Sequence, residues 1–133
     1  MLENKNTQIN YDDIDVEIRE LCQAINRIPH FETIESCFGH CAFGEGSKED
    51  ILIWIDVDDI VALNRFLCAF CHGYASISTY IGDDWVLEIY NNNTKQVDDL
   101  LHLLLRGRNI LGIVDCEKLA KSINDYADEF LGT

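Results

Sequence analysis

The order of hydrophobic patterns along the chain predicts an α+β domain. Residues 51–55 form an unbroken apolar run of strand length, typical of a strand buried on both faces. Apolar residues at steps of three and four over 58–73 and 93–107 indicate amphipathic helices, and 75–81 alternates with the strand period of two. The predicted order over about 51–114 is strand, helix, strand, strand, helix, strand, or βαββαβ. This is the order of a ferredoxin-like plait, in which two helices cover one face of an antiparallel sheet.

Two further elements are predicted before this plait. The apolar residues of segment 11–28 fall alternately four and three positions apart, which indicates an added N-terminal helix ended by Pro29. Residues 31–37 have β-branched residues at their centre, and we expect a short added strand there. The glycine-containing segment 39–50 is predicted to be a loop that leads into the plait.

Capping and turn residues set the limits of the first half of the plait. Asp58 is placed to cap the first helix, and Gly73 is placed to end it. The turn residues 82–84 separate the alternating segment 75–81 from the strand-like segment 85–90. These two segments are therefore predicted to form a hairpin.

The second half of the plait is predicted from a capping box. Asn93 and Gln96 lie three positions apart before a leucine-rich stretch, and Gly107 is placed to end the helix that they begin. A short strand is then expected over 109–114. Asp115 is placed to cap an added C-terminal helix.

Length and charge limit the class of protein. With 133 residues we expect a flexible N-terminus over 1–10 and a single domain over 11–133. The formal net charge is -14, and a surface this negative repels phosphates, so direct nucleic-acid binding is the least favoured function. The polar N-terminus and the shortness of every apolar run predict a cytoplasmic protein that does not contact membranes. Its six cysteines are then expected to be reduced.

The segment from Glu35 to Cys41 contains the first candidate for chemistry. Cys37 and His40 lie three residues apart on a turn that Gly39 permits, and they are candidates for a catalytic thiolate and imidazolium pair. The alternative is a cysteine that points into the core and a histidine that caps the turn.

A second cluster of soft ligands lies further along the chain. Cys68, Cys71 and His72 fall near the end of a predicted helix. The full set of candidate zinc ligands is Cys37, His40, Cys41, Cys68, Cys71 and His72. Because two cysteines three apart on an amphipathic helix more often pack against a core, the leading expectation is no cofactor, with zinc as the alternative.

Charged residues supply two more candidate sites. Arg106 and Arg108 offer donors for an anionic ligand such as a nucleotide, or they are cations placed at the end of a helix. Eight of the 24 carboxylates fall near predicted helix starts, where capping explains them. Five others, at the hairpin turn and in the last turns of the C-terminal helix, are candidates for a surface that binds a partner: Asp83, Asp84, Asp125, Asp128 and Glu129.

The segment from Glu35 to His40, followed after a gap by Ile53-Trp54-Ile55, resembles a family of small uncharacterised proteins from clostridial bacteria and their phages. Those proteins carry E-S-C-C-G-H-G and then an I-W-F strand. This chain departs from that pattern at Phe38 and Cys41. The resemblance implies a protein encoded by a phage or another mobile element.

The same segment is similar to the signature S-S-C-S-G-R of the wybutosine-synthesis methyltransferase family of transfer-RNA modification. Ser36, Cys37 and Gly39 match it, whereas His40 stands where that family has arginine. This similarity implies RNA modification as the setting for an enzyme based on Cys37 and His40.

The function predicted from these features is binding without catalysis. A small acidic protein suits an inhibitor that occupies the basic, nucleic-acid-binding site of a host protein such as a nuclease or a CRISPR effector. The alternatives are a thiol- or zinc-dependent enzyme around Cys37 and His40, and a module that binds a small ligand such as a nucleotide. The sequence is compatible with both a monomer and a homodimer.

Overall fold

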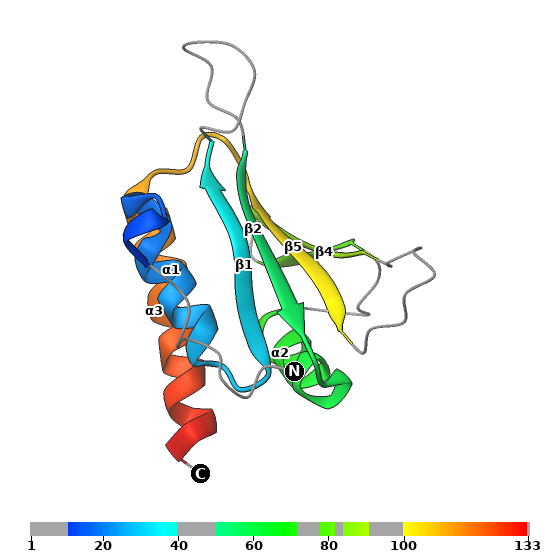
Figure 1. Ribbon diagram of the computed structural model, residues 1–133. Helices are drawn as coiled ribbons and strands as arrows, with labels where there is room; N and C mark the ends of the chain where they lie inside the picture. The colour runs from blue at the N-terminus through cyan, green and yellow to red at the C-terminus, as the bar shows by residue number, and fades with distance from the viewer. Residues whose placement is uncertain (1–10, 40–49, 72–77, 82–83, 91–99, 133) are drawn as a thin grey trace.

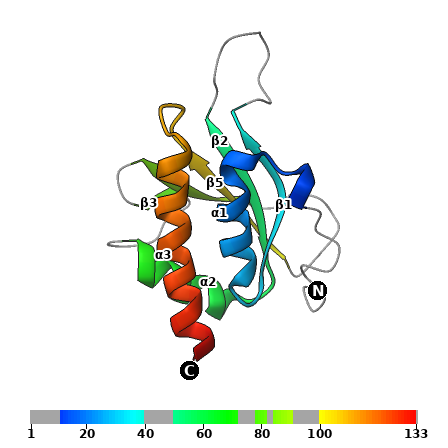
Figure 2. The ribbon, with the colours of Figure 1, turned by 90° about the vertical axis from the view of Figure 1, so that its left-hand side faces the viewer.

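The computed structural model describes residues 11–39, 50–71, 78–81, 84–90 and 100–132. A short 3-10 helix η1 (Tyr11–Asp13) precedes helices α1 (Val16–Arg27), α2 (Ile60–Phe70) and α3 (Ile113–Gly132). Figures 1 and 2 show α1 and α3 side by side against one face of the sheet. None of the helices in the described ranges has the length and apolar character needed to cross a membrane.

Over the described ranges, the sheet has five strands in the order β1-β2-β5-β4-β3, and each neighbouring pair is antiparallel. Their bounds are Phe31–Phe38 for β1, Ile51–Val57 for β2, Ser78–Ile81 for β3, Trp85–Tyr90 for β4 and Leu101–Gly107 for β5. The predicted α+β class is therefore confirmed, and the layering is compatible with a ferredoxin-like arrangement. The predicted N-terminal helix, the added strand, the hairpin and the C-terminal helix are all present.

The helix predicted over 93–107 is wrong where the structure describes it. Residues 101–107 form β5, which lies between β2 and β4 at the centre of the sheet. Leu103 and Leu105 are buried, and each pairs with residues on both adjacent strands. Pairing on two sides outweighs the helix propensity of leucine, which is only a weak preference. Residues 93 and 96 of the expected capping box lie outside the described ranges.

Gly107 has a different role from the helix end that was predicted. It lies opposite Trp85 in the sheet, and a Cβ at this position would meet the Trp85 ring at 2.7 Å. Glycine is thus needed so that the indole can lie against the strand. The strand predicted over 109–114 is also wrong, because these residues turn and then begin α3 at Ile113.

The caps are shifted relative to the sequence prediction. Asp59, not Asp58, caps α2 by accepting a hydrogen bond from the Val61 amide at 2.9 Å. Asp115 lies within the first turn of α3, and its carboxylate accepts from the Gly112 amide at 2.9 Å. Helix α2 therefore begins one residue later than predicted, and α3 begins three residues earlier.

Alternate residues of the strands form the core beneath the helices. The largest fully buried side chains on this face include Phe31, Ile53, Leu87, Leu103 and Leu105, and they pack against Ile18, Leu21 and Ile25 of α1 and Ile123 of α3. Helix α2 joins them through Phe66, whose ring lies 5.2 Å from that of Phe31. We call this the covered face of the sheet.

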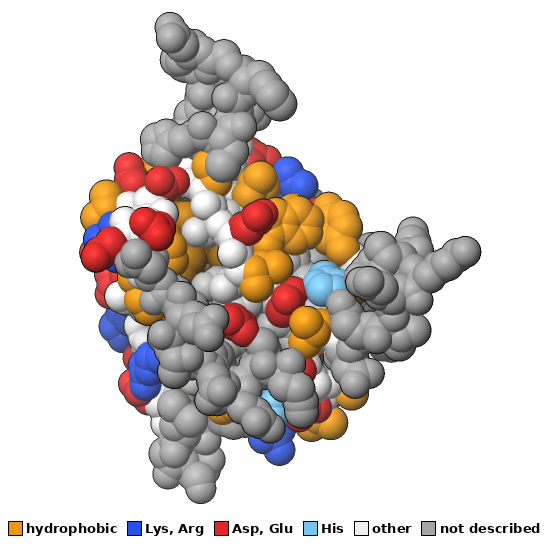
Figure 3. Space-filling model, viewed as in Figure 1, with side chains coloured by type: hydrophobic (Ala, Val, Ile, Leu, Met, Phe, Trp, Pro, Cys, Tyr) orange, Lys and Arg blue, Asp and Glu red, His pale blue; other side chains and the backbone are white. Residues whose placement is uncertain are grey.

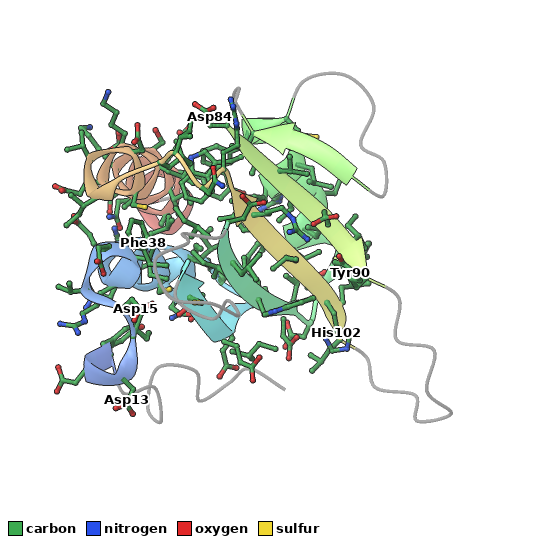
Figure 4. All side chains as sticks on the ribbon, turned by 90° about the horizontal axis from the view of Figure 1, so that it is seen from above. Asp13, Asp15, Phe38, Asp84, Tyr90 and His102 are labelled. Atoms are coloured by element: carbon green, nitrogen blue, oxygen red, sulfur yellow. The ribbon has the colours of Figure 1, made fainter. Side chains whose placement is uncertain are left out.

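Helix α1 also closes part of the free edge of β1. The Thr33 amide donates to Oδ1 of Asn26 at 2.7 Å, and the Phe38 amide donates to Oδ2 of Asp15 at 2.8 Å. Figure 4 shows Asp15 and Phe38 next to each other. Unpaired edge amides attract other strands, so these two bonds protect the edge.

Candidate functional site

The side chains that point away from the helices form a second surface, which we call the open face. Strand register assigns it Glu32, Glu35 and Cys37 of β1, Leu52, Trp54 and Asp56 of β2, Val86, Glu88 and Tyr90 of β4, and His102, Leu104 and Arg106 of β5. No helix in the described ranges covers it. Figure 3 views the molecule from this side and shows acidic side chains set among apolar ones over the strands. This surface combines rings, cations and carboxylates, the groups that recognise charged partners.

An irregularity in β1 brings two carboxylates to this face. Glu32 and Glu35 are three residues apart, so they would lie on opposite faces of a regular strand. The register shifts between Thr33 and Glu35, which leaves Ile34 as an extra, exposed residue. A bulge of this kind restores Glu35 to the same face as Glu32. Glu32 then lies opposite Asp56, and Glu35 lies opposite Trp54.

Two aromatic rings meet across the centre of the open face. Trp54 lies on β2 and Tyr90 on β4, with β5 between them, yet their ring centroids are only 5.1 Å apart. Strands two positions apart are separated by about 10 Å, so both rings lean over β5. Leu104 of β5 is 2% exposed although it is not part of the core beneath the helices. We attribute its burial to these two rings.

Asp56 and His102 form a bonded pair at one end of this ring pair. Nδ1 of His102 lies 2.7 Å from Oδ1 of Asp56, across neighbouring strands. Tyr90 is opposite His102 on the other side, and Figure 4 shows the two side by side. A carboxylate bonded to Nδ1 fixes the orientation of the imidazole.

Arg106 lies at the other end of the ring pair. Its Nε donates to Oε1 of Glu88 at 2.9 Å, and its Nη1 lies 3.8 Å from Oδ2 of Asp50. The hydrogen bond with Glu88 raises the pKa of Arg106, and Tyr90 adds to the effect. The β4–β5 half of the open face therefore balances its carboxylate with a cation of its own.

The β1–β2 half of the open face has no such balance. Strand β1 contains no lysine or arginine. Within the part of the chain that the structure describes, neither Glu32 nor Glu35 forms an ion pair. Among the described residues, the ion-pair partner of Asp56 is His102, which is charged only when protonated. This half is accordingly the more negative one.

The predicted thiol site is only partly described. Cys37 is buried on the open face, and it forms a disulfide whose other cysteine lies outside the described ranges. The expectation of reduced cysteines is therefore wrong for Cys37, and in this state it offers no thiolate for catalysis or zinc. Gly39 has φ 76°, as the predicted turn requires. His40 and Cys41 lie outside the described ranges.

The second group of predicted zinc ligands is divided by the fold. Cys68 is exposed on α2, whereas Cys71 is buried at the C-cap of that helix, and neither of them is in a disulfide. His72 lies outside the described ranges. Among the described side chains, no group of three or more His, Cys, Asp or Glu residues is placed to hold a metal ion.

The two predicted anion ligands are each held by carboxylates. Arg106 pairs with Glu88, and Nη1 of Arg108 lies 3.1 Å from Oδ1 of Asp84, which Figure 4 shows away from Tyr90 and His102. Both guanidinium groups thus have partners within the chain. An anionic ligand would have to compete with them.

The predicted acidic surface is also largely paired. Asp125 pairs with Lys121 at 2.9 Å, Asp128 pairs with Arg27, and Asp84 pairs with Arg108. Glu129 is exposed, and Asp83 lies outside the described ranges. These pairs reduce the excess negative charge of α3 and of the hairpin. They shift attention to the carboxylates of β1 and of the start of α1.

Sequence reasoning missed the residues of the open face that carry the most chemistry. Trp54 belongs to the predicted apolar run 51–55, His102 belongs to the leucine-rich stretch that predicted a helix, and Asp56 had no predicted role. The available signal was the placement of Asp56 between Ile55 and Val57 and of His102 between Leu101 and Leu103, because polar residues flanked by apolar ones mark the strand face that points away from the core. Comparison of the chain with protein-family models, with curated proteins and with solved structures gives no match.

Proposed function

We propose that this protein is an acidic, non-enzymatic binding protein that occupies a basic surface on a protein partner. The observation that supports this most strongly is the excess of carboxylates around β1. Glu32 and Glu35 have no cation beside them on the open face among the described residues, and Asp13 and Glu20 expose further negative charge at η1 and α1. A surface of one sign speeds association with an oppositely charged partner and directs its orientation.

The charges that the fold itself needs do not account for this excess. Asp15 and Asp59 accept hydrogen bonds from backbone amides, and Asp58 bonds to His30 at 2.6 Å. Among the described residues, neither Glu32 nor Glu35 makes a side-chain hydrogen bond or ion pair of this kind. Figure 3 shows further acidic side chains gathered over the start of α1, at the upper left. These carboxylates are available to a partner at no cost to the fold.

The form of this function that we propose is inhibition. Carboxylates held on a rigid sheet take the place of nucleic-acid phosphates in the basic site of a host nuclease or CRISPR effector. The net charge of -14 supports competition with nucleic acid rather than binding to it. The resemblance to proteins of clostridial phages favours a gene carried by a mobile element.

Displacement of DNA from a basic protein tests the proposal. The probe is protamine, an arginine-rich protein, bound to a labelled DNA duplex. Addition of this protein should release the duplex, seen as a fall in fluorescence anisotropy, and release should weaken steeply as NaCl is raised. Release that does not depend on salt, or no release at low salt, would overturn the proposal.

Two double variants locate the surface. Glu32→Lys with Glu35→Lys, and Asp125→Lys with Asp128→Lys, change the net charge by the same amount. We expect the β1 pair of changes to weaken displacement by about tenfold more than the α3 pair, since interface charges near the contact dominate. Equal losses would mean that net charge alone acts and that the surface around β1 is not the binding site.

A further inference from the structure

Trp54 adds an aromatic ring to the negatively charged β1–β2 half of the open face. Trp54 lies between Tyr90, whose ring is 5.1 Å away, and Glu35, which faces it in the register with β1. Trp54 is only partly exposed, and Tyr90 is 41% exposed. An indole beside a carboxylate attracts cations in two ways: through the negative potential at the face of the ring and through the negative charge of the carboxylate.

The neighbouring pair of residues places like charges together. Glu32 and Asp56 are directly opposite each other on β1 and β2, and like charges in such a cross-strand pair destabilise a sheet. His102 bonds to Asp56 on its other side. A positive group placed between Trp54 and the two glutamates of β1 would relieve this repulsion.

The chemistry of the cation follows from these neighbours. A guanidinium group is planar, stacks on aromatic rings and donates two parallel hydrogen bonds to a carboxylate. The ammonium of lysine is a compact charge that is strongly hydrated and stacks less well. The fold already holds one guanidinium on this face, because Arg106 lies beside Glu88 and Tyr90. In the described part of the chain, the β1–β2 half offers an indole and carboxylates without a guanidinium of its own.

We propose that the β1–β2 half of the open face binds an arginine side chain of the partner, with its guanidinium stacked on Trp54 and paired with Glu35, and with Glu32 adding charge. This assignment rests on the proposed function, and it names the group that the acidic surface takes. The bulge at Ile34 is part of the site, since it brings Glu35 to the same face as Glu32.

The two tryptophans of the chain allow a direct test. Trp54 lies on the open face, and Trp85 is 6% exposed on the covered face. The probe is a blocked peptide of alternating arginine and glycine, titrated at low salt while the two indole N–H signals are followed by NMR. The Trp54 signal, identified by its loss in Trp54→Phe, should shift on binding, and the Trp85 signal should stay in place.

Two comparison peptides identify the charged group. Citrulline in place of arginine keeps the shape and removes the charge, and it should abolish the shift. Lysine in place of arginine should bind about threefold to tenfold more weakly, because cation–π stacking and paired hydrogen bonds are lost. Equal shifts and affinities for the lysine and arginine peptides would overturn the guanidinium assignment.

Matched variants separate the site from net charge. Glu35→Gln and Glu117→Gln each remove one negative charge from an exposed side chain, the second on α3. Glu35→Gln should weaken binding of the arginine peptide, as followed by the Trp54 signal, about threefold to tenfold, and Glu117→Gln should have little effect. The unchanged Trp85 signal verifies that each variant is folded.

The outcomes distinguish this inference from the proposed function. Salt-dependent binding of the peptide without a shift at Trp54, or with equal losses in Glu35→Gln and Glu117→Gln, overturns the arginine site and leaves the acidic binding function standing. Failure to displace DNA from protamine overturns the function itself.

Discussion

The covered face and the open face of the sheet are built from alternate residues of the same strands, and they differ in how their polar side chains are paired. On the covered face, Thr33 is buried and has a dedicated partner, since Nδ2 of Asn26 donates to its hydroxyl at 2.8 Å. On the open face, Glu88 pairs with Arg106, whereas Glu32 and Glu35 of β1 have no ion-pair partner among the described residues. The difference separates polar groups that stabilise the fold from charged groups that can bind a partner.

The largest expected difference between the two faces concerns leucines on adjacent strands. Leu103 is 0% exposed on the covered face, so Leu103→Ala should lower the free energy of unfolding by about 3–5 kcal/mol through lost burial and a cavity. Leu52 lies half-buried on the open face, and Leu52→Ala should cost about 1 kcal/mol. Urea unfolding followed by circular dichroism measures both. Similar costs would mean that the open face is packed as a second core.

The next prediction concerns the buried polar network. Asn26 is 1% exposed and bonds to the amide and the hydroxyl of Thr33, and its Nδ2 lies 3.0 Å from the hydroxyl of Tyr11. Asn26→Ala should cost about 2–3 kcal/mol, because it leaves buried polar groups unbonded. The exposed Gln23 of the same helix is the control, and Gln23→Ala should cost less than about 0.5 kcal/mol. If Asn26→Ala costs no more than Gln23→Ala, water must form the hydrogen bonds that the Asn26 side chain made.

A third prediction uses pH to compare a buried and an exposed thiol. Burial raises the pKa of the Cys22 thiol from 9.0 to about 11, against the opposing hydrogen bond with Ser36. Above pH 9 the unfolded chain loses this proton and the folded chain keeps it, so stability falls as pH rises toward 11. The loss should reach about 1 kcal/mol by pH 10.

The matched variants for this prediction are Cys22→Ala and Cys68→Ala. The difference in unfolding free energy between pH 8 and pH 10 should shrink in Cys22→Ala and remain in Cys68→Ala, whose thiol is exposed. A pH dependence that survives in both variants would assign the loss to other groups.

The sequence predicted the layers of this fold better than its site, for physical reasons. The helices α1 and α3 carry clear apolar stripes, because each buries one side only. Strand β5 was mistaken for a helix because Leu104 is apolar on the open face and breaks the alternation. The bulge at Ile34 could not be predicted, since it is defined by pairing with β2 and not by residue type. The acidic site depends on that bulge and on which carboxylates find cations in the folded chain.

The smallest expected effect concerns the ion pair on the open face. Glu88 and Arg106 are 25% and 38% exposed, so Glu88→Gln should lower the free energy of unfolding by about 0.2–1 kcal/mol, and less at high salt. Asp84→Asn, which breaks the more exposed pair with Arg108, should cost less still. A loss in Glu88→Gln as large as that in Asn26→Ala would mean that this pair supports the fold as the covered network does. In that case the open face would be structural on its β4–β5 half, and only the β1–β2 half would remain for a partner.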